Sequence, residues 1–164
     1  MLFSLILVIA TIVAWVLGRR SSAWPDHARR GLAAAMVVAG AAHLLGPEPF
    51  LQHLPAWVPA RNALVYGSGL VEIGLGMALL SPARRVAAGR LLALFLLAVW
   101  PANFYVALAG VDVAGQPGGI YPWLRLPLQV LFIGWALWST RPSVPVAPGE
   151  APEAPATATA ITAA

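Results

Sequence analysis

The sequence predicts an all-α polytopic membrane protein, in which a helix bundle crosses the lipid bilayer. Of the 164 residues, 60% are hydrophobic and only 10% are charged, whereas soluble domains are about 45–50% apolar and about 25% charged. The apolar residues lie in five long blocks, which short polar, proline-rich or glycine-rich segments separate. Blocks of this length are typical of transmembrane helices. We therefore expect five spans, with the lipid bilayer as their first partner.

The first block, Leu2–Gly18, is predicted to be a retained transmembrane helix rather than a cleaved signal peptide. A signal peptide carries positive charge before its apolar block, but here Arg19 and Arg20 follow the block. With about 17 residues, the block is at the short end for a span. Together with the polar loop Ser21–Arg30 it forms an N-terminal unit, residues 1–30.

Four further spans form a second unit, residues 31–141. They are expected at Gly31–Leu45, Asn62–Leu80, Leu91–Gly110 and Trp123–Thr140. The prolines of Pro47–Arg61 and the charges of Ser81–Arg90 predict loops without helix. Pro101 lies inside the fourth span and removes a backbone hydrogen bond, so we expect a kink there. Residues 142–164 are rich in Pro, Ala and Thr and are predicted to form a disordered cytoplasmic tail.

The arginines predict the orientation of the bundle. All ten basic residues are arginines, and only Arg61 and Arg125 lie at the outer ends of the predicted spans. The other eight lie in alternate loops: Arg19, Arg20, Arg29, Arg30, Arg84, Arg85, Arg90 and Arg141. Because cytoplasmic loops carry the excess of positive charge, we expect an outside N-terminus and a cytoplasmic C-terminus in a bacterial plasma (inner) membrane. The sequence contains no basic run with interleaved aromatic residues, which is the pattern that would indicate nucleic-acid binding.

Polar residues from different spans are predicted to meet in the middle of the bundle. At about 1.5 Å of rise per residue, His43 and Asn103 lie roughly 18 Å above the inner ends of their helices, and Glu72 lies roughly 15 Å below the outer end of its helix. Ser68 and Gly76 share the face of Glu72 at i, i+4 and i+8, so this face points into the bundle. A carboxyl group in hydrocarbon is costly, which makes Glu72 a candidate for a functional site.

Further candidates lie nearer the outer surface. Arg125 and Gln129 share a helix face because they are four residues apart. Tyr66 and Ser68 are also candidates for the polar pocket, although tyrosine at this depth is more typical of an interfacial anchor. Arg125, taken alone, is more typical of a side chain that extends to the interface. In a purely structural alternative, His43, Glu72 and Asn103 satisfy one another and fix the helix register.

The sequence predicts no metal site and no catalytic residue. The chain contains no cysteine, which excludes disulfides, thiol relays and iron–sulfur ligation. Haem between two histidines requires two facing intramembrane histidines, and only His43 lies within a predicted span. His43, His53 and Glu48 lack the spacing of a metal site.

Four passages carry a family resemblance: AAHLLGPEPFLQHLPAWVP, YGSGLVEIGLGMALLSPARRVA, VWPANFYVAL and LRLPLQVLFIGWALW. Together they cover roughly Leu32–Arg141 and resemble the DoxX family of small bacterial membrane proteins. The resemblance implies a four-helix membrane bundle, to which Leu2–Gly18 adds an extra N-terminal transmembrane helix. It also implies quinone-linked redox work, since the family is named after a subunit associated with thiosulfate:quinone oxidoreduction. The polar residues that recur in the family correspond to His43, Glu72, Asn103, Arg125 and Gln129.

Three functions stay open. The favoured one is a non-catalytic membrane subunit or scaffold of a larger complex, with a polar pocket in its outer half. The second is a quinone-linked oxidoreductase component, in which His43, Glu72 and Asn103 bind quinone oxygens and relay protons. The third is a small-solute or proton pathway, which in so short a chain requires a homo-oligomer. No cofactor is encoded, so electrons would come from a redox partner protein through a quinone, and whether the chain is an enzyme stays open.

Overall fold

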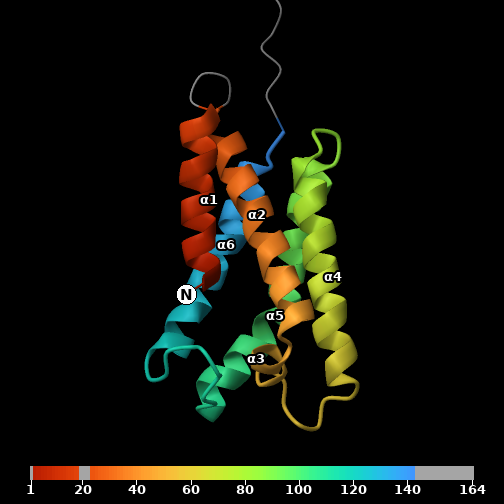
Figure 1. Cartoon of the computed structure of the whole chain (residues 1–164), viewed down its shortest axis with the longest axis vertical. Helices are drawn as coiled ribbons and strands as arrows, with labels where there is room; N and C mark the ends of the chain where they lie inside the picture. Colours follow the sequence, from red (N-terminus) through yellow and green to blue (C-terminus); the bar gives the residue numbers. More distant parts are fainter. Residues whose placement is uncertain (1, 19–22, 143–164) are drawn as a thin grey trace, which may run out of the picture.

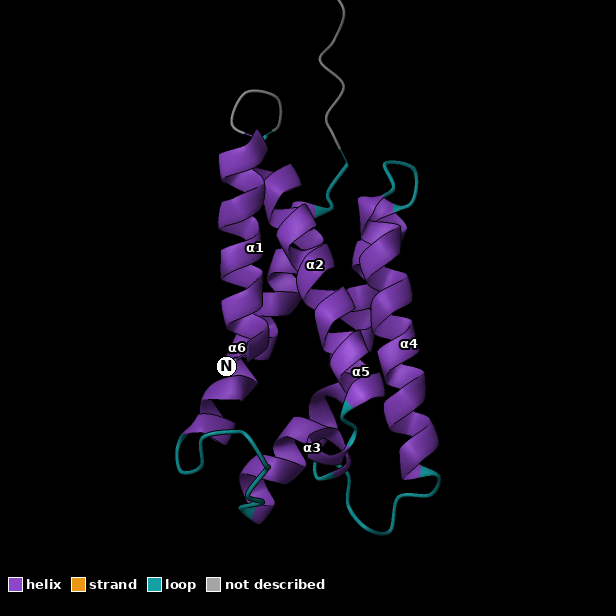
Figure 2. Cartoon of the chain, viewed as in Figure 1, coloured by secondary structure: helices purple, strands orange, loops and turns teal. Residues whose placement is uncertain are grey.

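The structure is a computed structural model that describes residues 2–18 and 23–142, and this part of the chain is all-α. Its helices are α1 (Leu2–Gly18), α2 (Trp24–Leu45), α3 (Glu48–Leu51), α4 (Arg61–Leu80), α5 (Arg85–Ala109) and α6 (Tyr121–Ser139). Figure 2 shows only helices and loops in the described chain. The predicted helical fold class is therefore confirmed, whereas the predicted tail at 143–164 lies outside the described residues.

The long helices run in alternating directions along the chain. Figure 1 shows the start of α2, the α4–α5 connection and the end of α6 at one end of the bundle, and α3 with the α5–α6 loop at the other. We call these the arginine end and the α3 end. Arg29, Arg30, Arg84, Arg85, Arg90 and Arg141 lie in or next to the helix termini of the arginine end, and Arg61 and Arg125 lie toward the α3 end.

Two helices, α4 and α5, are long and apolar enough to cross a membrane. Glycines bring α4 close to α2. A Cβ on Gly69 would lie 2.7 Å from the Cβ of His43 and 2.8 Å from the carbonyl oxygen of Gly40, and one on Gly76 would lie 2.9 Å from the Ala33 oxygen. The two backbones therefore touch at positions where a larger residue does not fit. The face of α4 that carries Gly69 and Gly76 points into the bundle, as predicted.

The helices begin earlier than the sequence indicated at two loops. Residues 24–30 were predicted to be loop, but α2 begins at Trp24, and Pro25 lies in its first turn, where a missing N–H costs nothing. Likewise α5 begins at Arg85 within the predicted loop Ser81–Arg90. In both cases polar residues extend an apolar helix, because their side chains find partners at the arginine end.

The proline-rich segment after α2 was expected to contain no helix, and this prediction was wrong at one turn. Glu48–Leu51 forms α3, with Pro47 at its N-cap and Pro49 in its first turn. Proline is tolerated there because the first N–H groups of a helix have no intrahelical acceptor. In α5, the helix continues past Pro101 to Ala109, and Figure 1 shows the second half of α5 slanting away from the first.

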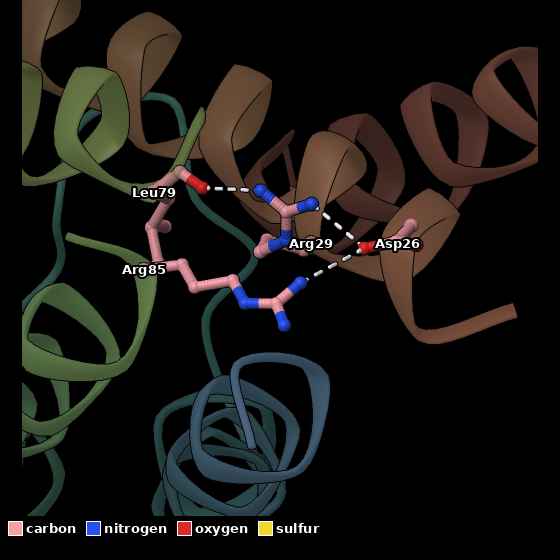
Figure 3. Close-up of polar contacts among 4 residues, drawn as sticks. All are labelled: Asp26, Arg29, Leu79 and Arg85. Carbon is pink, nitrogen blue, oxygen red and sulfur yellow. Dashed lines mark hydrogen bonds and ion pairs between the residues drawn. The ribbon is translucent and has the colours of Figure 1, made fainter. Parts of the chain in front are cut away.

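An ion-pair network ties three helices together at the arginine end. The side chain of Arg29 in α2 is 8% exposed and donates to the carbonyl oxygen of Leu79 (2.6 Å) at the end of α4 and to Asp26 (2.7 Å). Arg85 at the start of α5 lies 3.6 Å from the same Asp26 carboxylate. Figure 3 shows Asp26 between the two guanidinium groups. Arg29 thus satisfies a carbonyl group that the end of a helix leaves without a donor.

The hydrophobic core lies in the same half of the bundle. Its buried residues come from five helices: Leu7, Leu32, Ala33, Ala35, Met36, Leu79, Ala88, Leu92, Leu96 and Ala136. Apolar packing therefore dominates the arginine half of the bundle.

Candidate functional site

A cavity of about 1120 Å³ occupies the half of the bundle toward α3. Helices α2, α3, α4, α5 and α6 and the α5–α6 loop all contribute to its walls. Most of the wall is apolar, and the polar or charged side chains on it include His43, His53, Ser68, Glu72, Asn103, Gln116, Tyr121, Arg125 and Gln129. Large apolar cavities with a few converging polar groups are the usual form of ligand-binding sites.

His43 and Glu72 meet at the contact between α2 and α4. Nδ1 of His43 lies 3.2 Å from Oε2 of Glu72 and 2.9 Å from the carbonyl oxygen of Ala39. The contact with Glu72 is within ion-pair distance, although the buried Oε2 makes no hydrogen bond in the described chain. The imidazole stacks on Phe50 of α3, with ring centroids 3.7 Å apart. The ring of His43 is therefore held in place. Oε2 of Glu72, by contrast, is a buried acceptor that makes no hydrogen bond in the described chain.

Asn103 and Gln129 join α5 to α6. Nδ2 of Asn103 donates to Oε1 of Gln129 (3.1 Å), and Nε2 of Gln129 donates to the carbonyl oxygen of Leu96 (2.7 Å). Both side chains are buried. Pro101 leaves the carbonyl oxygen of Leu97 without its backbone donor, and the bond from Gln129 goes to the adjacent carbonyl oxygen, that of Leu96. Asn103 therefore pairs with Gln129, and the alternative in which it pairs with His43 and Glu72 is not what the structure has.

A third polar cluster, which we call the Arg125 cluster, consists of Arg125, His53 and Gln116. Nη1 of Arg125 donates to Nε2 of His53 and to Oε1 of Gln116, each at 2.7 Å. Nδ1 of His53 bonds to the carbonyl oxygen of Pro49 at 2.8 Å. Burial, and next the charge of Arg125, lower the pKa of His53 to about 4. The cluster thus consists of one cation and two neutral acceptors.

A family model described as a domain of unknown function (DUF8561) matches residues 32–140, about two thirds of the chain. The chain belongs to this family. The DUF8561 region begins in α2 and ends after α6, so it contains every polar residue on the cavity wall and leaves out α1. No curated protein and no solved structure is significantly similar to the chain.

The structure brings six of the seven candidate residues to one cavity within the DUF8561 region. They are His43, Ser68, Glu72, Asn103, Arg125 and Gln129. The hydroxyl of Ser68 donates to the carbonyl oxygen of Val65 (2.8 Å). Tyr66 is 42% exposed and does not line the cavity. That these residues bind a ligand stays a prediction.

Sequence reasoning missed His53 and Gln116. Both lie in loops that are distant in sequence from α6, and no pattern joins them to Arg125. The available signal was Arg125 itself. A cation one turn inside a helix needs acceptors, and the loops at its end of the bundle carry few polar side chains. In the structure Arg125 bonds within the protein, so the expected extension to the membrane interface is not its only role.

Proposed function

We propose that this protein is a DoxX-like, multi-pass integral membrane protein that holds a lipophilic ligand in its cavity and serves as a non-catalytic membrane subunit of a larger complex. The observation that carries the proposal is the cavity, with apolar walls and a few polar groups at fixed positions. A volume of about 1120 Å³ is slightly above the range of about 300–1,000 Å³ that is usual for ligand sites.

The hydrogen bonds on the wall favour holding a ligand over transforming it. His43, His53, Ser68 and Gln129 each bond to a backbone carbonyl oxygen. Such bonds fix the orientation of a side chain, which lowers the cost of ordering it when a ligand binds. Groups held in this way present a preformed surface.

The ligand proposal can be tested with a pair of glycines on α4. A Cβ on Gly67 or on Gly74 would meet open space, but only Gly67 lines the cavity. We expect Gly67→Phe to fold and to lose the lipophilic molecules that copurify with the wild-type protein from native membranes. Gly74→Phe should keep them. Equal retention by the two variants, measured by mass spectrometry of the purified proteins, would refute the ligand site.

The multi-pass orientation can be tested with two exposed alanines in a chain that has no cysteine. Ala56 lies near the α3 end and Ala83 in the α4–α5 connection at the arginine end. With the arginine end in the cytoplasm, an impermeant thiol reagent should label Ala56→Cys in intact cells and leave Ala83→Cys unlabelled until the membrane is opened. The opposite pattern would reverse the proposed topology.

A quinone-linked role is the second candidate, and Oε2 of Glu72 is the observation that favours it. This buried acceptor has no hydrogen-bond partner in the described chain and lies 3.2 Å from Nδ1 of His43. A carboxyl and an imidazole side by side can exchange protons with a bound quinone. Quinone among the copurified molecules of the wild type, and its absence from Gly67→Phe, would favour this role over a purely structural ligand.

A further inference from the structure

We propose that the cavity takes an amphiphile with an anionic head group, which Arg125 binds while the aliphatic tail lies along the apolar walls. The inference rests on the proposed function, since it names the class of the lipophilic ligand. It is carried by the charge balance of the Arg125 cluster and by the distribution of polar groups along the cavity.

Arg125 is a cation without a counter-charge in the described part of the chain. No carboxylate in the described chain lies within ion-pair distance of its guanidinium. Gln116 is neutral, and His53 is neutral because Nδ1 bonds to the Pro49 carbonyl oxygen and Nε2 accepts from Arg125. Withdrawing an arginine from water without a paired charge is costly, and a bound anion removes this cost.

The guanidinium also has donors to spare. The hydrogen bonds to His53 and Gln116 both come from Nη1, and neither Nε nor Nη2 bonds to an acceptor in the described chain. Carboxylates and phosphates bind arginine through two parallel hydrogen bonds. The loop that carries Gln116 is held by a bond from the backbone N–H of Ala114 to Oε1 of Gln52 (2.7 Å), so the cluster is fixed on both sides.

The cavity continues from this cluster into apolar surroundings. Along α6 its wall runs from Tyr121 to Phe132, which at 1.5 Å per residue is about 16 Å. The far part of the wall is lined by Met36, Phe95, Leu96 and Phe132. Each CH₂ of an aliphatic chain that leaves water for this wall stabilises the complex through the hydrophobic effect.

The carboxyl group of Glu72 helps to decide where the head group lies. A carboxylate head group only accepts hydrogen bonds, and beside Glu72 it would face Oε2, an oxygen that has no hydrogen-bond partner in the described chain. Arg125 instead presents N–H donors to the cavity. The anion therefore belongs at Arg125.

The experiment measures binding of four probes to the full chain in a neutral detergent: oleate, its methyl ester, phosphatidylglycerol and inorganic phosphate. We expect oleate or phosphatidylglycerol to bind at least tenfold more tightly than the methyl ester, and the tighter of the two identifies the natural source of the anion. Inorganic phosphate should bind weakly, because it has no tail. In Arg125→Gln the preference for the anion should vanish, while Arg125→Lys should keep part of it.

Arg90→Gln is the matched control, because it removes one positive charge from an exposed position on α5 that does not line the cavity. It should bind like the wild type. Equal affinity of the wild type for oleate and its methyl ester would overturn the anionic head group and leave the lipophilic site intact. An anion preference that persists in Arg125→Gln would also overturn it. Binding of none of the tailed probes would refute the proposed function itself. The comparison of oleate with its methyl ester uses only the wild type, so its result does not depend on whether any variant folds.

Discussion

Nε2 of His53 accepts a 2.7 Å hydrogen bond from the guanidinium of Arg125, across 72 residues of sequence. The other ring nitrogen bonds to the carbonyl oxygen of Pro49, which can only accept, so Nδ1 carries the hydrogen and the imidazole is neutral. A protonated ring would present a hydrogen atom to Arg125 in place of a lone pair. Burial, followed by the charge of Arg125, accordingly lowers the pKa of His53 from 6.5 to about 4.

This lowered pKa predicts a loss of stability in mild acid. Above pH 6.5 neither the folded nor the unfolded protein protonates His53, and the stabilisation is complete. As the pH falls from 6.5 to about 4, only the unfolded chain takes up the proton, and the free energy of unfolding falls by up to roughly 3 kcal/mol. Thermal unfolding in detergent should show that the advantage of the wild type over His53→Gln shrinks across this range. Parallel pH curves for the two proteins would contradict the neutral imidazole.

Asp26→Asn is expected to destabilise the arginine end. Hydrogen bonding from Arg29 is the largest cause that lowers the pKa of Asp26, so its stabilisation is present above pH 3.8 and is lost as the pH falls through the lowered pKa. Breaking a buried pair costs about 3–5 kcal/mol, but Asp26 is 31% exposed, and solvent screening reduces the loss to about 1–2 kcal/mol. Asp112→Asn, at an exposed position, should leave the melting temperature unchanged. A similarly small effect of Asp26→Asn would show that water replaces the carboxylate.

Hydrophobic blocks predicted the long helices well. In apolar surroundings the backbone of such a block can form hydrogen bonds only within itself, and a helix forms all of them. The start of α2 was missed because the buried position of Arg29 depends on a carbonyl group at the end of α4, fifty residues away. Sequence periodicity contains no information on such a contact.

The candidate site, like the helices, could be predicted from the sequence only in part. Depth along each helix predicted that Glu72 and His43 would meet, because depth follows from residue number. Depth did not predict that Asn103 would pair with Gln129, since rotation of α5 and α6 about their axes decides which amides face each other. His53 and Gln116 were missed for a related reason: loop residues have no regular rise from which a position can be calculated.

Gly69→Ala should weaken the contact between α2 and α4. The new Cβ would lie 2.7 Å from the Cβ of His43 and 2.8 Å from the carbonyl oxygen of Gly40, both too close for atoms of a packed interior. Relieving this overlap by moving the helices apart costs about 1–3 kcal/mol. Gly74→Ala, whose Cβ meets open space on the same helix, should be neutral or slightly stabilising. A melting temperature of Gly69→Ala equal to that of Gly74→Ala would show that the helices separate without cost.

Glu72→Gln tests whether the carboxyl group serves function or structure. Glutamine keeps the shape and polarity of the side chain, and Oε2 has no hydrogen-bond partner to lose in the described chain. We therefore expect normal folding, with a melting temperature close to that of the wild type, and loss of the copurifying ligand or of the activity of the complex. If Glu72 instead formed an internal ion pair with His43, removing one partner would strand the other and cost about 3–5 kcal/mol.

Two further variants separate the remaining cases for Glu72. His43→Ala removes the imidazole that lies 3.2 Å from Oε2, and Asn103→Ala leaves Oε1 of Gln129 without its 3.1 Å donor. Asn103→Ala should cost about 1–3 kcal/mol, because it leaves a buried acceptor unsatisfied, whatever the function. Loss of ligand in Glu72→Gln and His43→Ala, with melting changed little in Glu72→Gln, would identify the pair as part of the binding site. Wild-type ligand content in both would mean that the carboxyl group, despite its buried position, takes no part in binding.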